Sequence, residues 1–145
     1  MFLPQRDRLF SRFKVDTSSD YRLKENEVLI SDGITRLKQL KPYRFNFKKD
    51  PSVTVDGFFA HEVTPVVPQA VTGDKDEVYT EENATDGFNA GDIRTQSLDY
   101  SKLTPLLTAA LQEAVAKIET LETENTDLKN LIKNSSSFAA LKSSL

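Results

Sequence analysis

The chain has 145 residues, of which 38% are hydrophobic and 28% charged, and its formal net charge is -3. This length fits one ordinary domain, and the slight acidic excess argues against a nucleic-acid partner, whose phosphates attract basic proteins. Because there is no cysteine and only one histidine, His61, disulfides, thiolate nucleophiles and histidine-rich metal cages are excluded. We therefore expect no metal and no other cofactor.

The first eighteen residues mix basic and aromatic positions without a steady period. Pro4, Arg6, Asp7 and Arg8 interrupt the apolar run that a signal peptide needs, and the apolar runs elsewhere are too short to cross a membrane. We expect a soluble chain without a membrane partner, in which residues 1–18 are the end of a preceding segment.

Residues 19–98 predict a small head of the α+β class. A short helix is expected between a cap at Ser31 or Asp32 and a stop at Pro42. Strict alternation over residues 43–48 indicates a half-buried strand, and the apolar segment 57–63 indicates another short helix. The economical prediction is a small mixed sheet with short helices.

Residues 73–98 form an acidic segment that is interrupted by glycine and asparagine. It is long for a simple connection, so it is either an extended arm or a mobile insertion. Its acidic clusters lack the ligand spacing around a sharp glycine turn that a calcium loop needs, and a solvated loop explains them better.

The carboxy-terminal third carries the clearest periodic signal. Apolar residues recur in alternating steps of four and three, which is the a/d pattern of a heptad repeat and predicts a parallel coiled coil of identical chains. The helix is expected over residues 99–133 and a flexible tail over 134–145. An amphipathic helix that packs on its own domain is the alternative. The predicted coiled-coil core consists of Leu107, Leu111, Ala114, Ile118, Leu121, Asn125, Leu128 and Ile132.

The segment "TSSDYRLKEN", residues 17–26, places Ser19 and Lys24 five residues apart. A serine can act as a nucleophile without histidine if a neutral lysine serves as the base. An ordinary lysine is neutral in only about one molecule in a few thousand at pH 7, so such a base needs burial beside another cation, for which Arg22 is a candidate.

Geometry restricts this pair, because residues five apart lie about 140° apart on a helix and on opposite faces of a strand. The chain must therefore bend between Ser19 and Lys24, or the pair must form between two chains. A serine and a lysine at such spacing occur by chance in many proteins, so the residues alone favour a polar turn leading into a helix over catalysis.

Four sequence blocks, in this order along the chain, favour the interpretation of Ser19 and Lys24 as a catalytic pair. They are "SSDYRLKEN", "ITRLKQLKPYRFNFK", "DGFFAHEVTPVVPQAV" and "DYSKLTPLLTAALQEAVAKIETLE". Together they resemble the carboxy-terminal intramolecular chaperone domain of phage tail spikes, tail fibres and neck appendages, a family also regarded as a self-cleaving serine/lysine endopeptidase. The resemblance covers roughly residues 18–131. Two positions depart from the family pattern: His61 stands where glutamine is usual, and Glu27 where an apolar residue is common.

The resemblance implies a homotrimer that registers the fibre or spike stem of the same precursor, or of another chain in trans, and then detaches by autoproteolysis. By position, Ser19 is the nucleophile, Lys24 the general base and Ser19-Asp20 the cleavage junction, with Arg22 and Asn26 as support. The Ser18-Ser19 bond is the alternative, because attack of Ser19 on its own carbonyl closes a strained small ring.

The implied domain layout is an upstream segment over 1–18 that cleavage removes, a chaperone head over 19–98 with the arm or insertion 73–98, a trimerisation helix over 99–133 and a flexible tail over 134–145. The implied location is the host cytoplasm during virion assembly, with release from the mature fibre after cleavage. Two alternatives are a structural trimerisation module at a fibre tip that never cleaves, and the related self-cleaving domain of membrane-tethered transcription regulators.

Overall fold

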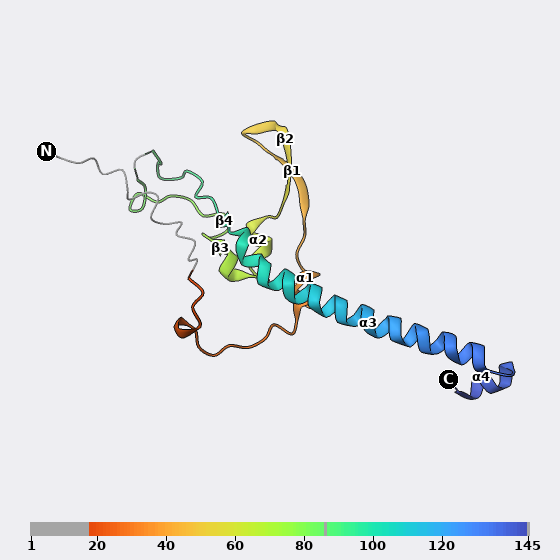
Figure 1. Ribbon diagram of the computed structural model, residues 1–145. Helices are drawn as coiled ribbons and strands as arrows, with labels where there is room; N and C mark the ends of the chain where they lie inside the picture. The colour runs from red at the N-terminus through yellow and green to blue at the C-terminus, as the bar shows by residue number, and fades with distance from the viewer. Residues whose placement is uncertain (1–17, 86, 145) are drawn as a thin grey trace.

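The computed structural model describes residues 18–85 and 87–144, and Figure 1 shows a small head from which a hairpin, an arm and a long helix extend. The elements in chain order are η2 (Tyr21–Leu23), α1 (Gly33–Leu37), β1 (Tyr43–Phe47), β2 (Asp50–Gly57), α2 (Ala60–Val63), η3 (Pro68–Ala70), β3 (Val71–Thr72), β4 (Ser97–Leu98), η4 (Tyr100–Leu103), α3 (Thr104–Asn134) and α4 (Phe138–Ser144). Nearly all of the predicted upstream segment, residues 1–17, lies outside the described residues.

The predicted α+β class, with short helices ahead of a long carboxy-terminal helix, is confirmed. The strands form two separate antiparallel pairs, β1 with β2 and β3 with β4, and not one mixed sheet. Along the chain, the helices α2 and η3 stand between β2 and β3. Within the described part of the chain, none of the helices combines the length and apolar composition that a membrane crossing requires.

The β1–β2 hairpin follows the alternation seen in the sequence. Tyr43 and Phe45 are half-buried, whereas Arg44 and Asn46 are exposed, so one face of the strand packs and the other meets solvent. Phe45 stacks on Phe59 at the start of α2, with a ring centroid distance of 5.8 Å. This contact attaches the hairpin to the head at its base and leaves the rest of it projecting (Figure 1).

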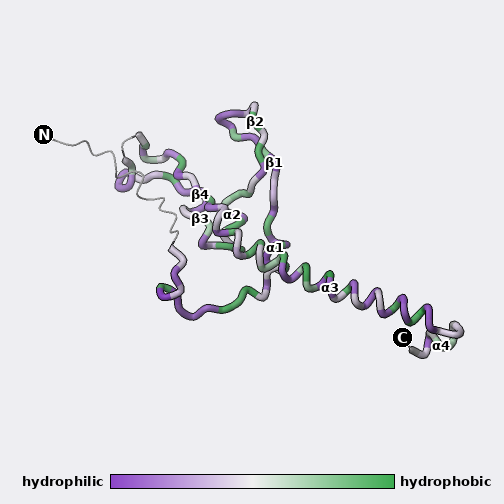
Figure 2. The backbone as a smooth tube through the Cα atoms, viewed as in Figure 1, coloured by the Kyte–Doolittle hydropathy of each residue, from purple (hydrophilic) through white to green (hydrophobic). Residues whose placement is uncertain are grey.

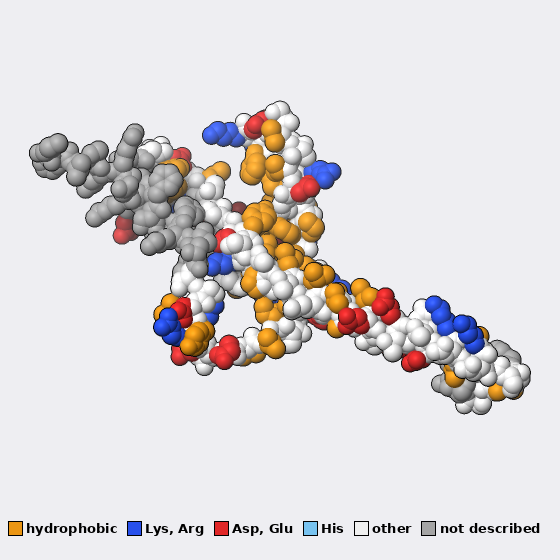
Figure 3. Space-filling model, viewed as in Figure 1, with side chains coloured by type: hydrophobic (Ala, Val, Ile, Leu, Met, Phe, Trp, Pro, Cys, Tyr) orange, Lys and Arg blue, Asp and Glu red, His pale blue; other side chains and the backbone are white. Residues whose placement is uncertain are grey.

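The core of the head is small and aliphatic. Its buried members come from the end of the α1 turn, α2, η3, η4 and the start of α3, and they are Leu40, Val63, Val66, Val67, Ala70, Leu103 and Leu106. Phe58, Val71 and Leu98 pack against this cluster and are partly buried. Figure 3 shows further hydrophobic side chains at the surface of the hairpin and of the part of α3 next to the head, and Figure 2 shows that hydrophobic residues recur further along α3.

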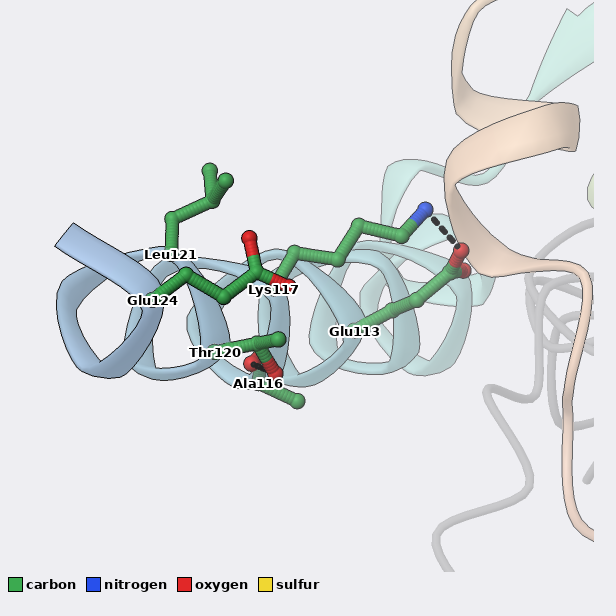
Figure 4. Close-up of a pocket in the computed structure, with 6 residues that line it drawn as sticks. All are labelled: Glu113, Ala116, Lys117, Thr120, Leu121 and Glu124. Atoms are coloured by element: carbon green, nitrogen blue, oxygen red, sulfur yellow. Dashed lines mark hydrogen bonds and ion pairs between the residues drawn. The ribbon is translucent and has the colours of Figure 1, made fainter. Parts of the chain in front are cut away.

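α1 crosses α3 at very short range through Gly33. A Cβ atom at this position would lie 2.5 Å from the backbone nitrogen of Ala110, so only glycine allows this approach. The Ile34 N–H also donates to Glu113 Oε2 at 3.0 Å, and the other carboxylate oxygen of Glu113 accepts from Lys117 Nζ at 2.9 Å. Figure 4 shows the Glu113 side chain reaching under α1 while Leu121, two turns further along, projects away from it.

α3 presents two different faces. Leu106 and Ala110 are buried by the head, each only 2% exposed. The predicted heptad residues lie on another face, where the exposed fractions of Leu107, Leu111, Ile118, Leu121, Leu128 and Ile132 run from 44% to 66%. The long helix is confirmed, and its association with other copies stays a prediction. Beyond it, the short helix α4 lies in the segment for which the sequence predicted a flexible tail.

The acidic segment 73–98 is a loop closed by contacts of its own. Val78 and Ile93 form an antiparallel bridge, Tyr79 stacks on Phe88 at a centroid distance of 4.6 Å, and Arg94 pairs with Glu77. β4 then returns the chain to β3, so the two ends of the loop meet at the head.

Candidate functional site

A single turn of 3-10 helix, η2, bends the chain directly after Ser19. The amide N–H groups of Leu23 and Lys24 donate to the carbonyls of Asp20 and Tyr21, each at 3.1 Å. Asp20 caps this turn, because its carboxylate accepts from the backbone N–H of Arg22 at 2.9 Å. A short turn with a local cap is therefore the element that redirects the chain here.

This bend brings the two predicted catalytic residues together within one chain. Lys24 Nζ donates to Ser19 Oγ at 2.7 Å, although neither a regular helix nor a strand would allow the contact. The distance lies within the range expected for a nucleophile and its base. Both side chains are exposed to solvent in the single chain. The geometry thus fulfils the first condition for a serine/lysine pair, and the catalytic roles of both residues stay predictions.

Arg22 binds Asp20. Its guanidinium donates to both carboxylate oxygens, at 3.0 Å from Nε to Oδ1 and 2.6 Å from Nη2 to Oδ2. This side-chain contact, together with the backbone N–H of Arg22, lowers the pKa of Asp20 below its ordinary value. Asp20 therefore stays ionised at neutral pH, and the ion pair keeps the turn closed.

Asn26 holds the backbone in the left-handed region, with a φ of 56°. Asparagine tolerates this conformation better than most residues with a side chain. Its predicted supporting role thus has a physical basis in the backbone, because it sets the direction in which the chain leaves the dyad.

His61 lies outside this site. It belongs to α2, is exposed and stacks on Phe59 at a centroid distance of 6.0 Å. Among residues 18–85 and 87–144, no group of three or more acidic or histidine side chains is arranged to hold a metal ion.

Two apolar residues that follow the dyad in the sequence were not predicted to be exposed. Val28 and Leu29 are 88% and 92% exposed, respectively, although both are large and apolar. The signal that could have found them is the apolar run of residues 28–30 between the polar segments 24–27 and 31–33.

The comparison with protein-family models gives one match, over residues 19–72, to Peptidase_S74, described as chaperone of endosialidase. The matched range begins at Ser19 and ends in β3, so it contains the dyad, α1, the hairpin and α2. None of the curated proteins compared with the chain matches it. The family description supports a chaperone role, and the family name supports a serine peptidase. Residues 19–72 of the chain are thus similar to the family described as chaperone of endosialidase.

Proposed function

We propose that the chain is an intramolecular chaperone that trimerises, sets the register of a phage tail fibre or tail spike, and then releases itself by autoproteolysis next to Ser19. The observation that carries the proposal is the 2.7 Å hydrogen bond from Lys24 Nζ to Ser19 Oγ inside the family match. A trimeric stem of interwound strands depends on non-local contacts and folds slowly, so a clamp that registers three chains first removes the slowest step.

The proposed reaction uses only these two side chains and water. A neutral Lys24 takes the Ser19 hydroxyl proton while Oγ attacks the carbonyl carbon of Ser18. The bond between that carbon and the Ser19 nitrogen breaks, the nitrogen receives the proton from Lys24, and an ester to Oγ remains. Water then hydrolyses the ester. The Ser19-Asp20 junction implied by the resemblance requires a different nucleophile on the Ser19 carbonyl, such as Ser19 of another copy.

Assembly supplies what the single chain lacks. Lys24 is exposed in the single chain. Exclusion of water and nearby positive charge both favour the neutral form of an amine, which a general base requires. A trimer brings neighbouring surfaces and symmetry-related cations to the dyad. Cleavage then follows assembly, and the released stem is difficult to unfold because its chaperone is gone.

The number of copies rests on the family resemblance. A heptad step of three runs from a to d, so Ile118, Asn125 and Ile132 occupy a, whereas Leu121 and Leu128 occupy d. Isoleucine at a with leucine at d favours two strands by itself. The molar mass of the complex therefore tests the trimer directly.

The test of cleavage is the intact mass of the purified chain under denaturing conditions, compared with a Ser19→Ala chain. The unsubstituted chain is expected to split beside Ser19, and the Ser19→Ala and Lys24→Met chains are expected to stay whole. The product masses differ by one serine between the two possible bonds, so the same spectrum identifies the bond. An unsubstituted chain that assembles and stays whole contradicts the peptidase.

One observation favours the second candidate, a trimerisation module that never cleaves: both members of the dyad are exposed to solvent. Chaperone action can be tested apart from cleavage by fusing a fibre stem to the chain. If the stem keeps its trimeric, denaturant-resistant form when the heptad leucines are made polar, the chaperone role fails.

A further inference from the structure

Residues 25–31, here called the strap, connect the dyad to α1 without any partner in the described chain. The strap contains no helix or strand, and within residues 18–85 and 87–144 no hydrogen bond or ion pair involves it. Backbone N–H and C=O groups in a folded protein are almost always paired or solvated. A strap of this kind is open to pairing with another chain.

The strap is also the most exposed apolar segment near the dyad. Val28 and Leu29 are 88% and 92% exposed, and Figure 2 shows the hydrophobic stretch directly ahead of α1. Single exposed apolar residues are ordinary, but a contiguous run in an unpaired segment marks a contact surface.

A matching surface lies between α1 and the start of α3. It is an apolar pocket of about 500 Å³, lined chiefly by Leu37, Leu40, Phe58, Tyr100, Leu103 and Leu107. The pocket has room for more than one aliphatic side chain. Leu107 belongs both to this pocket and to the heptad face, so the pocket is continuous with the surface at which other copies are expected.

The contacts of α1 with α3 fix the position along the α3 axis at which the strap begins. Gly33 packs on Ala110 and the Ile34 N–H binds Glu113, so the strap leaves α3 at residues 110–113. The pocket lies at residues 103–107, about 5–15 Å away along the helix axis. In a parallel coiled coil of identical copies, the neighbour's pocket lies at the same height.

The strap is long enough to reach that neighbour. Leu29 precedes Gly33 by four residues, a reach of about 13 Å in extended chain. Packed helix axes are about 8–10 Å apart. In the single chain Leu29 remains bare although its own pocket is present, which favours a pocket on another copy.

We propose that residues 28–30 of one copy dock in the Leu37–Leu107 pocket of the neighbouring copy and so complete the dyad's surroundings. This inference rests on the proposed function, because it needs the parallel assembly. The docked strap places Ser19 and Lys24 at a boundary between subunits, where the neighbour excludes water from the ammonium. Cleavage then waits for assembly because the site is incomplete in one chain.

A disulfide between copies tests the contact itself. The chain has no cysteine, so Leu29→Cys and Leu37→Cys can be placed in two differently tagged chains, both carrying Ser19→Ala, and co-expressed. Mild oxidation is expected to link the two different chains, since a disulfide requires Cβ atoms about 4 Å apart. The matched control pairs Leu29→Cys with Ile93→Cys, a position in the acidic loop that is more accessible than Leu37, at 75% against 36% exposed. Linkage no stronger than in this control overturns the proposal.

A cleavage assay tests the consequence. Leu29→Asp is expected to slow cleavage by at least about tenfold while the molar mass of the assembly stays unchanged, because the heptad face is untouched. Ile93→Asp, with the same change of charge on another exposed apolar residue, is expected to cleave at the unsubstituted rate. Equal rates for Leu29→Asp and the unsubstituted chain contradict the docking.

Sedimentation of the unsubstituted chain separates the two proposals. A chain that sediments as a single copy refutes both the proposed function and the docked strap. A chain that assembles and cleaves, but shows no link between positions 29 and 37, refutes the strap alone.

Discussion

The two ends of α3 carry the same helical geometry and differ in what covers them. Near its start, Leu106 and Ala110 are buried by the head. Further along, Val115, Ile118, Leu121, Leu128 and Ile132 remain 44–62% exposed. The close contact with α1 pairs the small residues Gly33 and Ala110, whereas most of the exposed aliphatic residues further along follow the heptad spacing. The buried start of α3 packs on the chain's own head, and the exposed face further along is suited to packing against other copies of the chain.

The largest expected effect comes from the bare end. Leu121→Asn combined with Leu128→Asn should abolish assembly, because burying a leucine contributes about 1.5–3 kcal/mol in each copy. Sedimentation should then show single chains, and the head should still fold, since neither leucine belongs to its core.

The matched control for this change is Thr120→Asn with Thr126→Asn, which alters two exposed residues outside the a and d positions. This chain should assemble normally. If it dissociates as the leucine variant does, the heptad face is not the contact between copies.

A smaller effect is expected at the buried end. Gly33→Ala should destabilise the head by about 1–3 kcal/mol, because the added Cβ meets the backbone of Ala110 at 2.5 Å. Urea unfolding measures this change. Thr35→Ala, on the exposed side of α1, is the control, and a Gly33→Ala chain as stable as this control would refute the close crossing.

The smallest effect is expected at Glu113, whose carboxylate joins α3 to α1. The pKa of Glu113 is lowered by the Ile34 backbone N–H and then by Lys117. Its contribution is therefore present above its ordinary value of 4.5 and is lost as the pH falls through the lowered value in the folded chain. Glu113→Gln should lower the unfolding midpoint slightly at neutral pH.

The same measurement in acid supplies the control for Glu113. Below the lowered pKa the unsubstituted chain carries an uncharged Glu113, so the difference between the two chains should disappear. A difference that persists there would mean that the charge is not what stabilises the crossing.

The sequence predicted those elements whose signal is local. Alternation over residues 43–48 predicts β1, and the heptad steps predict α3, because side-chain burial follows the period of each element. The Gly33–Ala110 crossing and the Glu113 contact could not be predicted, since each joins residues more than 70 positions apart and depends on how α1 packs on α3.

The sequence predicted which residues form the candidate site, but it did not predict how they are arranged. The sequence placed Ser19 and Lys24 five apart and required either a bend or a second chain. The bend depends on one turn of 3-10 helix capped by Asp20, an element too short to leave a periodic pattern. The exposed strap was missed because apolar residues in a sequence are ordinarily assigned to a core.

The account depends on cleavage that requires assembly, and the Leu121→Asn, Leu128→Asn chain tests this most directly. It keeps Ser19, Lys24 and the η2 turn, so only its association with other copies is changed. The intact mass after incubation should show an uncleaved chain, while the unsubstituted chain at the same concentration is split beside Ser19. Cleavage of the dissociated variant at the unsubstituted rate would contradict the account, because the dyad would then act within one exposed chain.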